Sequence, residues 1–300
     1  MGKIAVDLER ALVDRRLRGG TGQASGRLLA SGDGWSVHDV ICTSDPSDRP
    51  FEERHSRVSL AIVAAGTFQY RSTTGRALMT PGSILLGNAG QCFECGHEHG
   101  SGDRCIAFNY SPGYFETIAA DVGAGGAGLR FAAPRLPALR ESAGVVAQAG
   151  ARLIGATDVS WEEIALRLAA RVARLASSHV RAPAVAPTDA VARVTRVVRS
   201  IESAPAGNHT LSGLAEWAGL SRYHFLRTFE RLTGLTPHQY VRRARLRAAA
   251  LRLAGEKTKV IDVAYDSGFG DVSNFNRAFR DEFGATPLAF RASARAAATD

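Results

Sequence analysis

The chain has 300 residues and a formal net charge of +8 at pH 7, and 45% of its residues are hydrophobic. This length and apolar fraction favour two domains, each with its own core. No apolar run approaches the ~18 residues of a membrane span, and the N-terminal stretch lacks the apolar core of a signal peptide. We therefore expect a cytoplasmic protein whose four cysteines are thiols or metal ligands rather than disulfides.

The N-terminal half changes pattern near residue 31. Residues 1–30 are polar and glycine-rich; Ile4–Leu17 has the pattern of a short helix, and Gly19–Ser25 is expected to be loose. Residues 31–135 form short apolar runs divided by turn residues such as Pro81-Gly82. The runs are Trp35–Cys42, Val58–Val63, Thr67–Arg71, Ser83–Leu86 and Cys105–Tyr110. Short strands at this spacing favour a β-barrel or a sandwich.

One segment of this strand-rich region gathers metal-binding side chains. Residues 91–105 read QCFECGHEHGSGDRC and hold three of the four cysteines and two of the eight histidines. Thiolate and imidazole are ligands that Zn²⁺ and other thiophilic ions select. The candidate metal ligands are Cys92, Cys95, His97, His99 and Cys105.

Three interpretations of this segment remain open: a metal site, a thiol-based sensor of oxidants or electrophiles, and plain structure. The spacing is not that of a standard zinc finger or zinc ribbon. In a continuous strand Cys92 and Cys95 face opposite sides, so a shared ion requires the chain to turn near Cys95, which Gly96 allows. Cys42 lies far away in the sequence and either joins the cluster or belongs to the core.

Residues 136–180 are expected to be helical. Ala138–Ala156 forms one helix, and Ser160 with Glu163 makes the capping box of a second. The apolar stripe of the second helix consists of Ile164, Leu168, Val172 and Leu175. This stripe fits packing on the strand domain, a dimer interface, or both. Residues 181–188 contain two prolines and are expected to form a semi-rigid interdomain linker.

Residues 189–292 contain the same helix–turn–helix unit twice, before a short tail at 293–300. The copies read LAEWAGLSRYHFLRTFERLTGLTP and VAYDSGFGDVSNFNRAFRDEFGATP. Such a repeat indicates a duplicated structural unit. Gly219 and Gly268 suit the turns, and Ser221 and Asp271 suit the N-caps of the following helices. The phenylalanines of these helices form one buried stripe, which leaves arginines and polar residues outside, as in helices that enter the DNA major groove.

The connecting helix and the charge distribution agree with this interpretation. The helix begins at Pro237 behind the cap Thr236, has a basic face, and spans about 27 Å at ~1.5 Å per residue. This length suits two helices placed ~34 Å apart on one face of DNA. Residues 189–300 carry 17 basic and 11 acidic side chains, a net charge of +6, whereas residues 1–188 carry 20 and 18, a net charge of +2. Basic charge concentrated on one domain is typical of a polyanion binder.

Asp189–Arg291 resembles the DNA-binding domain of AraC/XylS-type bacterial transcription regulators. Both helix–turn–helix units, the linker helix and the terminal segment GFGDVSNFNRAFRDEFGATPLAFR occur in order. The string of His55, Val63–Gly66 and Pro81–Leu86 is similar, less specifically, to the cupin-like barrel of such proteins. The resemblance implies an α+β fold: an N-terminal cupin-like β-barrel with appended helices, then an all-α DNA-binding domain.

The resemblance also implies a function and its residues. Base-facing positions fall on Tyr223, Leu226 and Arg227 in the first unit and on Val272, Ser273 and Arg277 in the second. The full set of candidate DNA contacts is Ser221, Arg222, Tyr223, Leu226, Arg227, Arg231, Val272, Ser273, Asn276, Arg277 and Arg280. The hypothesis is a sequence-specific, non-enzymatic regulator whose barrel senses a ligand. Its expected partners are double-stranded DNA, a second copy of the chain and RNA polymerase. DNA binding needs no cofactor, and Zn²⁺ or another thiophilic ion is the candidate ligand of the cysteine segment.

Other functional classes remain to be weighed. One is an enzyme, either a metal-dependent barrel fused to a DNA-binding tail or a thiol that accepts an alkyl group. The cupin-enzyme pattern of histidines and a glutamate is not evident, and the cysteine spacing departs from that of alkyl acceptors. A barrel that only dimerises, or that holds a small organic effector, fits the sequence as well.

Overall fold

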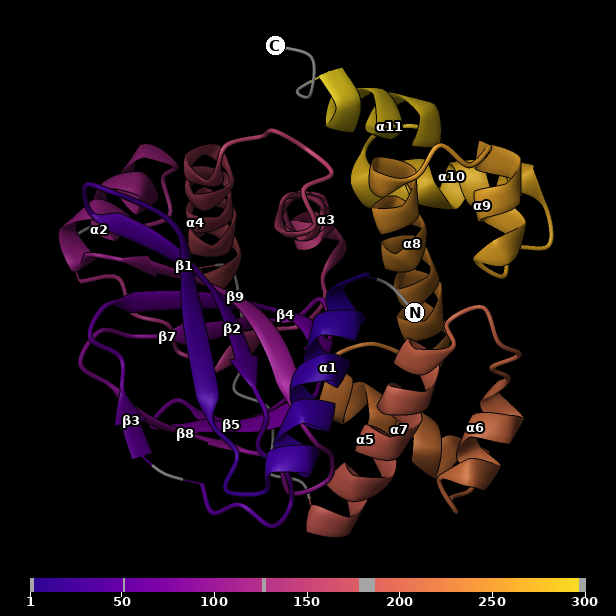
Figure 1. Cartoon of the computed structure of the whole chain (residues 1–300), viewed down its shortest axis with the longest axis horizontal. Coiled ribbons are helices and arrows are strands. Elements are labelled where there is room, and N and C mark those ends of the chain that lie inside the picture. The colour runs from indigo at the N-terminus through magenta and orange to yellow at the C-terminus, as the bar shows by residue number, and fades with distance from the viewer. Residues whose placement is uncertain (1–2, 51, 126–127, 178–186, 297–300) are drawn as a thin grey trace.

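The structure is a computed structural model that describes residues 3–50, 52–125, 128–177 and 187–296 (Figure 1). The helices are α1 (Lys3–Arg18), α2 (Pro112–Asp121), α3 (Arg140–Leu153), α4 (Trp161–Ser177), α5 (Thr188–Ser203), α6 (Leu211–Trp217), α7 (Arg222–Thr233), α8 (Pro237–Gly255), α9 (Val260–Asp266), α10 (Val272–Phe283) and α11 (Pro287–Ala296). The strands are β1 (Ala24–Gly32), β2 (Trp35–Cys42), β3 (Glu52–Arg54), β4 (Val58–Gly66), β5 (Phe68–Ser72), β6 (Gly75–Met79), β7 (Ile84–Gly87), β8 (Cys92–Gly96), β9 (Asp103–Tyr110) and β10 (Arg135–Leu136). Within the described ranges no helix has the length and hydropathy of a membrane span.

The strands form two antiparallel sheets. One has the order β1-β2-β9-β4-β7-β10 and the other the order β3-β8-β5-β6. Side chains such as Val63, Tyr70, Met79 and Cys105 form an apolar core that both sheets share. The hydrogen-bonded strand order leaves both sheets open. The expectation of a closed barrel is therefore wrong, and the two sheets form a sandwich. The likeness to a cupin remains a prediction.

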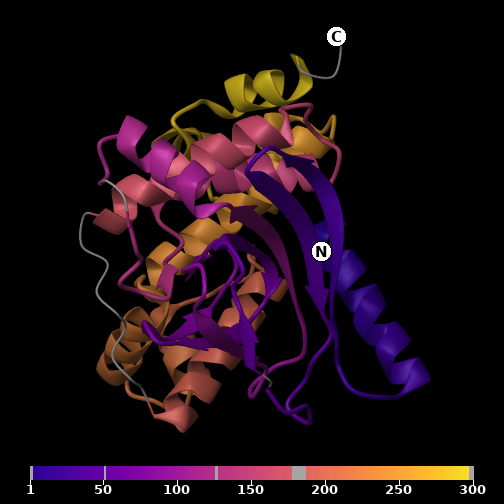
Figure 2. The same ribbon diagram turned by 90° about the vertical axis from the view of Figure 1, so that its left-hand side faces the viewer.

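Helices cover the other face of the six-stranded sheet. Figure 2 shows α2, α3 and α4 lying across one end of the strands. Leu60 and Phe108 from the sheet pack in one cluster with Ile164, Leu168 and Val172 of α4, which are all fully buried. The apolar stripe of this helix therefore packs on its own sheet, as expected. Whether its remaining surface also joins two copies of the chain stays a prediction.

Most predicted N-terminal elements are present, with additions. Ile4–Leu17 lies inside α1, and the expected runs correspond to β2, β4, β5, β7 and β9. The apolar runs do not predict β1, β3, β6, β10 or α2, whose sequences are short or interrupted by polar residues and glycine. The predicted linker falls largely on residues outside the described ranges, which resume at residue 187.

The doubled helix–turn–helix is built as the sequence predicts. Gly219 and Gly268 both have positive φ, 63° and 85°, the left-handed conformation that ends α6 and α9 cheaply only for glycine. Ser221 accepts a hydrogen bond from the amide of His224, and Asp271 accepts one from the amide of Asn274 at 2.6 Å. These caps satisfy amides that would otherwise lack partners at the start of α7 and α10. The phenylalanines that are fully buried are Phe225 and Phe229 in the first unit and Phe275 and Phe279 in the second.

The arginines of α8 are bound within the chain. Arg243 pairs with Glu282 at 3.1 Å, Arg247 pairs with Glu202 at 2.5 Å, and Arg252 contacts Glu256 and Asp266. Arg245 donates to the backbone carbonyls of Pro205, Gly207 and Gly268, each at 2.9 Å. Of the five arginines in the predicted basic face, only Arg242 is exposed. The face predicted from the sequence is therefore mainly a set of internal contacts.

Two arginines, the buried Arg135 and the half-buried Arg199, connect the N-terminal part to the helical domain. Arg135 of β10 donates to the carbonyls of Leu232 at 2.7 Å and Thr233 at 3.2 Å, at the end of α7. Arg199 of α5 donates to the carbonyl of Ser101 at 2.9 Å. In addition, α3 packs against α8 and α10, as Figure 1 shows. The two parts thus share a buried, hydrogen-bonded interface.

Candidate DNA-binding surface and cysteine–histidine cluster

The outer face of α7 carries the side chains predicted to contact DNA. Ser221, Arg222, Tyr223, Arg227 and Arg231 are exposed, and the tyrosine is 67% exposed. The Arg227 guanidinium donates to the Tyr223 hydroxyl at 3.1 Å and lies 5.8 Å from the centre of its ring. This contact preorders two long side chains one helical turn apart, the spacing at which they share a helix face.

The outer face of α10 has the same organisation. Ser273, Asn276, Arg277 and Arg280 are exposed, and Arg277 donates to the side chain of Asn274 at 3.4 Å. Two predicted contacts differ from the rest, since Leu226 on α7 and Val272 on α10 are half-buried. Both remain able to present a methyl group to a thymine, the apolar contact that the major groove offers. DNA contact by all these residues stays a prediction.

The cysteine–histidine segment divides between the interior and the surface. Cys95 faces the core between the sheets beside Tyr70 and Phe93, so Cys92 on the same strand faces the opposite side. His99 lines an open cavity of about 490 Å³ against α5 and α6, with Arg193 and Trp217 among its other lining residues. The structure therefore does not gather all five predicted ligands at one point.

A different set of side chains converges at the end of the core between the sheets. Ligand atoms of Cys42, His97 and Asp103 all lie within 4.8 Å of one another. His97 Nε2 lies 2.7 Å from Asp103 Oδ1, and the thiol of Cys105 donates to Asp103 Oδ2 at 3.3 Å. The sequence pattern leaves the role of Cys42 undecided and does not mark Asp103 as a ligand, although Asp103 stands in the same segment.

The pKa values of this cluster follow from burial and from the charge of Asp103. Burial disfavours a charged His97, but hydrogen bonds with Asp103 and Cys42 and the negative charge of Asp103 outweigh it and raise the pKa of His97 to about 9. Burial raises the pKa of the Cys95 and Cys105 thiols, and Asp103 raises it further. In the metal-free protein His97 is therefore cationic at neutral pH, and both thiols are protonated.

Known proteins match the helical domain. The family model described as "Helix-turn-helix domain" covers residues 214–293. The regulatory protein SoxS of Salmonella typhimurium is 35% identical over 78 residues, which are 26% of this chain and 73% of SoxS. The probable transcription factor PqrA of Proteus vulgaris is 36% identical over 78 residues, 26% of this chain and 64% of PqrA, so the chain spans less than two thirds of that relative.

Solved structures of similar proteins include the DNA-binding domain of AdpA, a global transcriptional factor, in complex with a target DNA. It is 31% identical and covers 35% of this chain and 94% of its own, with a TM-score of 0.34.

Proposed function

The chain belongs to the AraC-type transcription regulators, and we propose that α7 and α10 both read base pairs in the major groove. The observation that carries this proposal is the pair of exposed, matching faces on two helices whose caps, turn glycines and buried phenylalanines correspond one to one. Arg227 and Arg277 are the proposed readers of guanine, since a guanidinium can donate two parallel hydrogen bonds to its O6 and N7 atoms. The remaining exposed arginines position the helices on phosphates.

Arginine substitutions test this assignment. Binding sites are selected from random duplexes with the full chain, and affinities are then measured over a range of salt concentrations. Arg227→Ala and Arg277→Ala are each expected to cost about 1–3 kcal/mol and to relax the selected sequence at separate positions. The positions should lie about one DNA turn, ~10 base pairs, apart. The matched control is Arg171→Ala, an exposed arginine on α4.

The outcomes separate base readers from phosphate contacts. An arginine that only binds phosphate weakens all sequences alike and lowers the dependence of affinity on salt by about one unit of slope. The proposal fails if both variants fold and neither changes the affinity or the selected sequence.

We further propose that the N-terminal part senses a ligand and biases the helical domain. The contacts of Arg135 with the end of α7 and of Arg199 with Ser101 support this coupling, because they join the two parts through hydrogen bonds, the first of them buried. A ligand shifts such an equilibrium only to the extent that it binds one arrangement more tightly than the other. The protein then acts by binding rather than by catalysis, in the cytoplasm, as a homodimer that contacts RNA polymerase.

Two ligand classes fit two places, one inside the N-terminal part and one between His99 and helices α5 and α6 of the helical domain. The cluster of Cys42, His97, Asp103 and Cys105 suits a thiophilic ion or a thiol-reactive signal. The cavity beside His99 has a volume in the range of small-molecule sites and suits an organic effector. The donor set of the cluster makes the first class the stronger proposal.

A further inference from the structure

Cys42 and Asp103 meet because of the register of two strands. Cys42 ends β2, Asp103 begins β9, and the two are direct partners in the antiparallel ladder. Direct partners point to the same face of a sheet, and so does Cys105, two residues further along β9. This face looks towards the four-stranded sheet. Three potential ligands thus come from one rigid surface.

His97 reaches the same point from the other sheet. It follows directly after the end of β8, where the chain turns, as Gly96 allows. Its side chain is stacked at 6.1 Å from the ring of Phe68, which fixes its direction. His97, Asp103 and Cys105 are each at most 6% exposed. The cluster therefore bridges the two sheets, with three buried members and the half-buried Cys42 at its edge.

We propose that Cys42, His97, Asp103 and Cys105 form a closed site for a thiophilic divalent ion of the Zn²⁺ class. Two sulfurs, one imidazole nitrogen and one carboxylate oxygen are a donor set that Zn²⁺ accepts, whereas Mg²⁺ and Ca²⁺ require oxygen ligands. Four protein ligands without an open position are typical of structural or regulatory sites rather than catalytic ones. This proposal deepens the proposed function. The metal site itself does not depend on that function; only its regulatory consequence rests on it.

Three of the four ligands need only small movements, because the ligand atoms of Cys42, His97 and Asp103 already lie within 4.8 Å of one another. Cys105 joins them through its thiol, which donates to Asp103 at 3.3 Å. Bonds of ~2.0–2.1 Å in a tetrahedron separate a nitrogen and an oxygen ligand by about 3.3 Å. His97 Nε2 and Asp103 Oδ1 are 2.7 Å apart, so they must separate by roughly half an ångström. Because the residues between 97 and 102 form a turn, the histidine can make this movement more easily than the strand residues.

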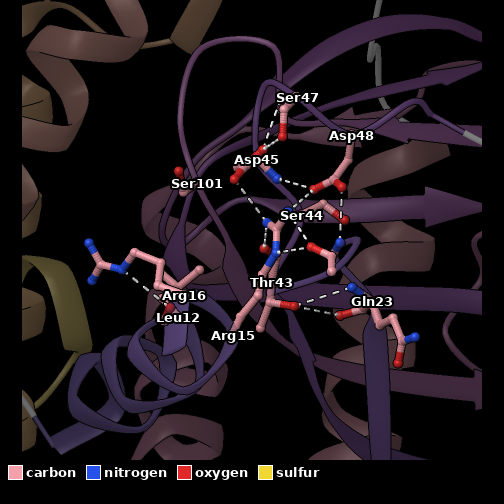
Figure 3. Close-up of polar contacts among 12 residues, drawn as sticks. Leu12, Arg15, Arg16, Gln23, Thr43, Ser44, Asp45, Ser47, Asp48 and Ser101 are labelled. Carbon is pink, nitrogen blue, oxygen red and sulfur yellow. Dashed lines mark hydrogen bonds and ion pairs between the residues drawn. The ribbon is translucent and has the colours of Figure 1, made fainter. Parts of the chain in front are cut away.

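The loops that carry the ligands are tied to neighbouring elements. The amide of Gly102 donates to the carbonyl of Ser44 at 2.8 Å, which joins the His97 loop to the loop after Cys42. Figure 3 shows Arg15 of α1 holding this second loop through Thr43, Asp45 and Asp48. The loop after Cys42 is therefore held in place by α1.

The turn that follows His97 contacts the helical domain. Arg199 of α5 donates to the carbonyl of Ser101 and to the hydroxyl of Thr67 at 3.2 Å, and Gly100 packs directly against its guanidinium. A change in the position of His97 on metal binding is passed to this turn within four residues. Metal occupancy would then alter the seating of α5 and, through it, the first helix–turn–helix unit.

Metal content of the full chain tests the site. Protein purified under reducing, chelator-free conditions is analysed for metal and then titrated with Co²⁺, whose sulfur-to-metal absorption reports thiolate ligation. We expect one ion per chain with this absorption. Cys42→Ser, His97→Gln and Cys105→Ser should each weaken binding by more than the ~10–100-fold that loss of an outer-shell partner costs. The matched controls are Cys92→Ser and His99→Gln, which should bind as the unaltered chain does.

A second measurement needs no variant. Alkylation of the unaltered protein is mapped by mass spectrometry with and without Zn²⁺, and the ion should protect Cys42 but not Cys92. Absence of tight binding by the unaltered chain, or binding that depends on Cys92 rather than Cys42, overturns the site. The same samples are tested for binding to the selected duplexes. A chain that takes up no metal but binds DNA refutes the metal site and leaves the proposed function standing. A chain that binds metal but has no affinity for DNA refutes the proposed function and leaves the metal site standing.

Discussion

Replacing Arg135 with methionine removes the guanidinium that β10 inserts beneath α7. Methionine keeps most of the apolar stem but none of the donors, so the carbonyls of Leu78, Leu232 and Thr233 lose a charged partner. The last two belong to the final turn of α7, where carbonyls have no partner within the helix. The substitution therefore acts on α7 from inside the N-terminal part.

Two opposing effects determine how much Arg135→Met changes the free energy of unfolding. Three hydrogen bonds to a charged donor contribute about 1.5–3 kcal/mol each. Against them stands the burial of the charge, which lowers the pKa of Arg135 to about 10. At ~1.4 kcal/mol per pKa unit, this lowering offsets roughly 3 kcal/mol. The hydrogen bonds dominate, and Arg135→Met is expected to lower the free energy of unfolding by about 1–6 kcal/mol.

Urea unfolding of the full chain and amide hydrogen exchange measure the effect. Exchange should accelerate most at residues 229–236, at the end of α7, and the unfolding midpoint should fall. Arg140→Met is the matched control, because Arg140 lies on the surface at the start of α3 and should change stability by no more than ~0.5 kcal/mol. If Arg135→Met unfolds like this control and exchange at α7 is unchanged, the reasoning about the interface is refuted.

Two further predictions concern the cores of the two domains. Burial lowers the pKa of His55 to about 4, so the unfolded chain binds its proton more tightly, and stability should fall by about 3 kcal/mol as the pH drops from 6.5 to 4. In His55→Gln, which keeps a polar partner for the Tyr70 hydroxyl, urea midpoints at the two pH values should differ less, and an unchanged difference would contradict the argument. Phe279→Ala removes a fully buried ring that touches three other phenylalanines and should cost about 3–5 kcal/mol in urea unfolding. Leu288→Ala, at a position 66% exposed, should stay within ~0.5 kcal/mol, and equal losses in the two variants would speak against the assigned core.

The helical domain could be predicted closely because its signals are local. A cap such as Ser221 and a turn glycine such as Gly219 act within three or four residues. Phenylalanines at helical spacing show in the sequence both the helix and its buried face. The arginines of α8 show the limit of this reasoning. Their spacing predicts a basic face, but their partners, such as Glu202 and Glu282, come from other helices and determine whether the charge is free.

The cluster of Cys42, His97, Asp103 and Cys105 could be predicted only in part for a related reason. The alternation of side chains along a strand separates Cys92 from Cys95, and the structure agrees. The meeting of Cys42 with Asp103 depends on the register between β2 and β9, which pairs residues 61 positions apart. No local pattern encodes that register. It follows from turns, a bulge in β4 and the shared core, which only the folded chain supplies.

The three hydrogen bonds of Arg245 have a mechanical consequence for the operator. One guanidinium holds Pro205 and Gly207, beside the first unit, and Gly268, in the turn of the second. The two units are thereby clamped at a fixed separation and tilt. A duplex whose half-sites do not match that separation must bend or twist to meet both helices, at a cost of order 1–6 kcal/mol that depends on its sequence. Flexible pyrimidine–purine steps between the half-sites lower this cost, so base pairs that the protein never touches contribute to the choice of operator.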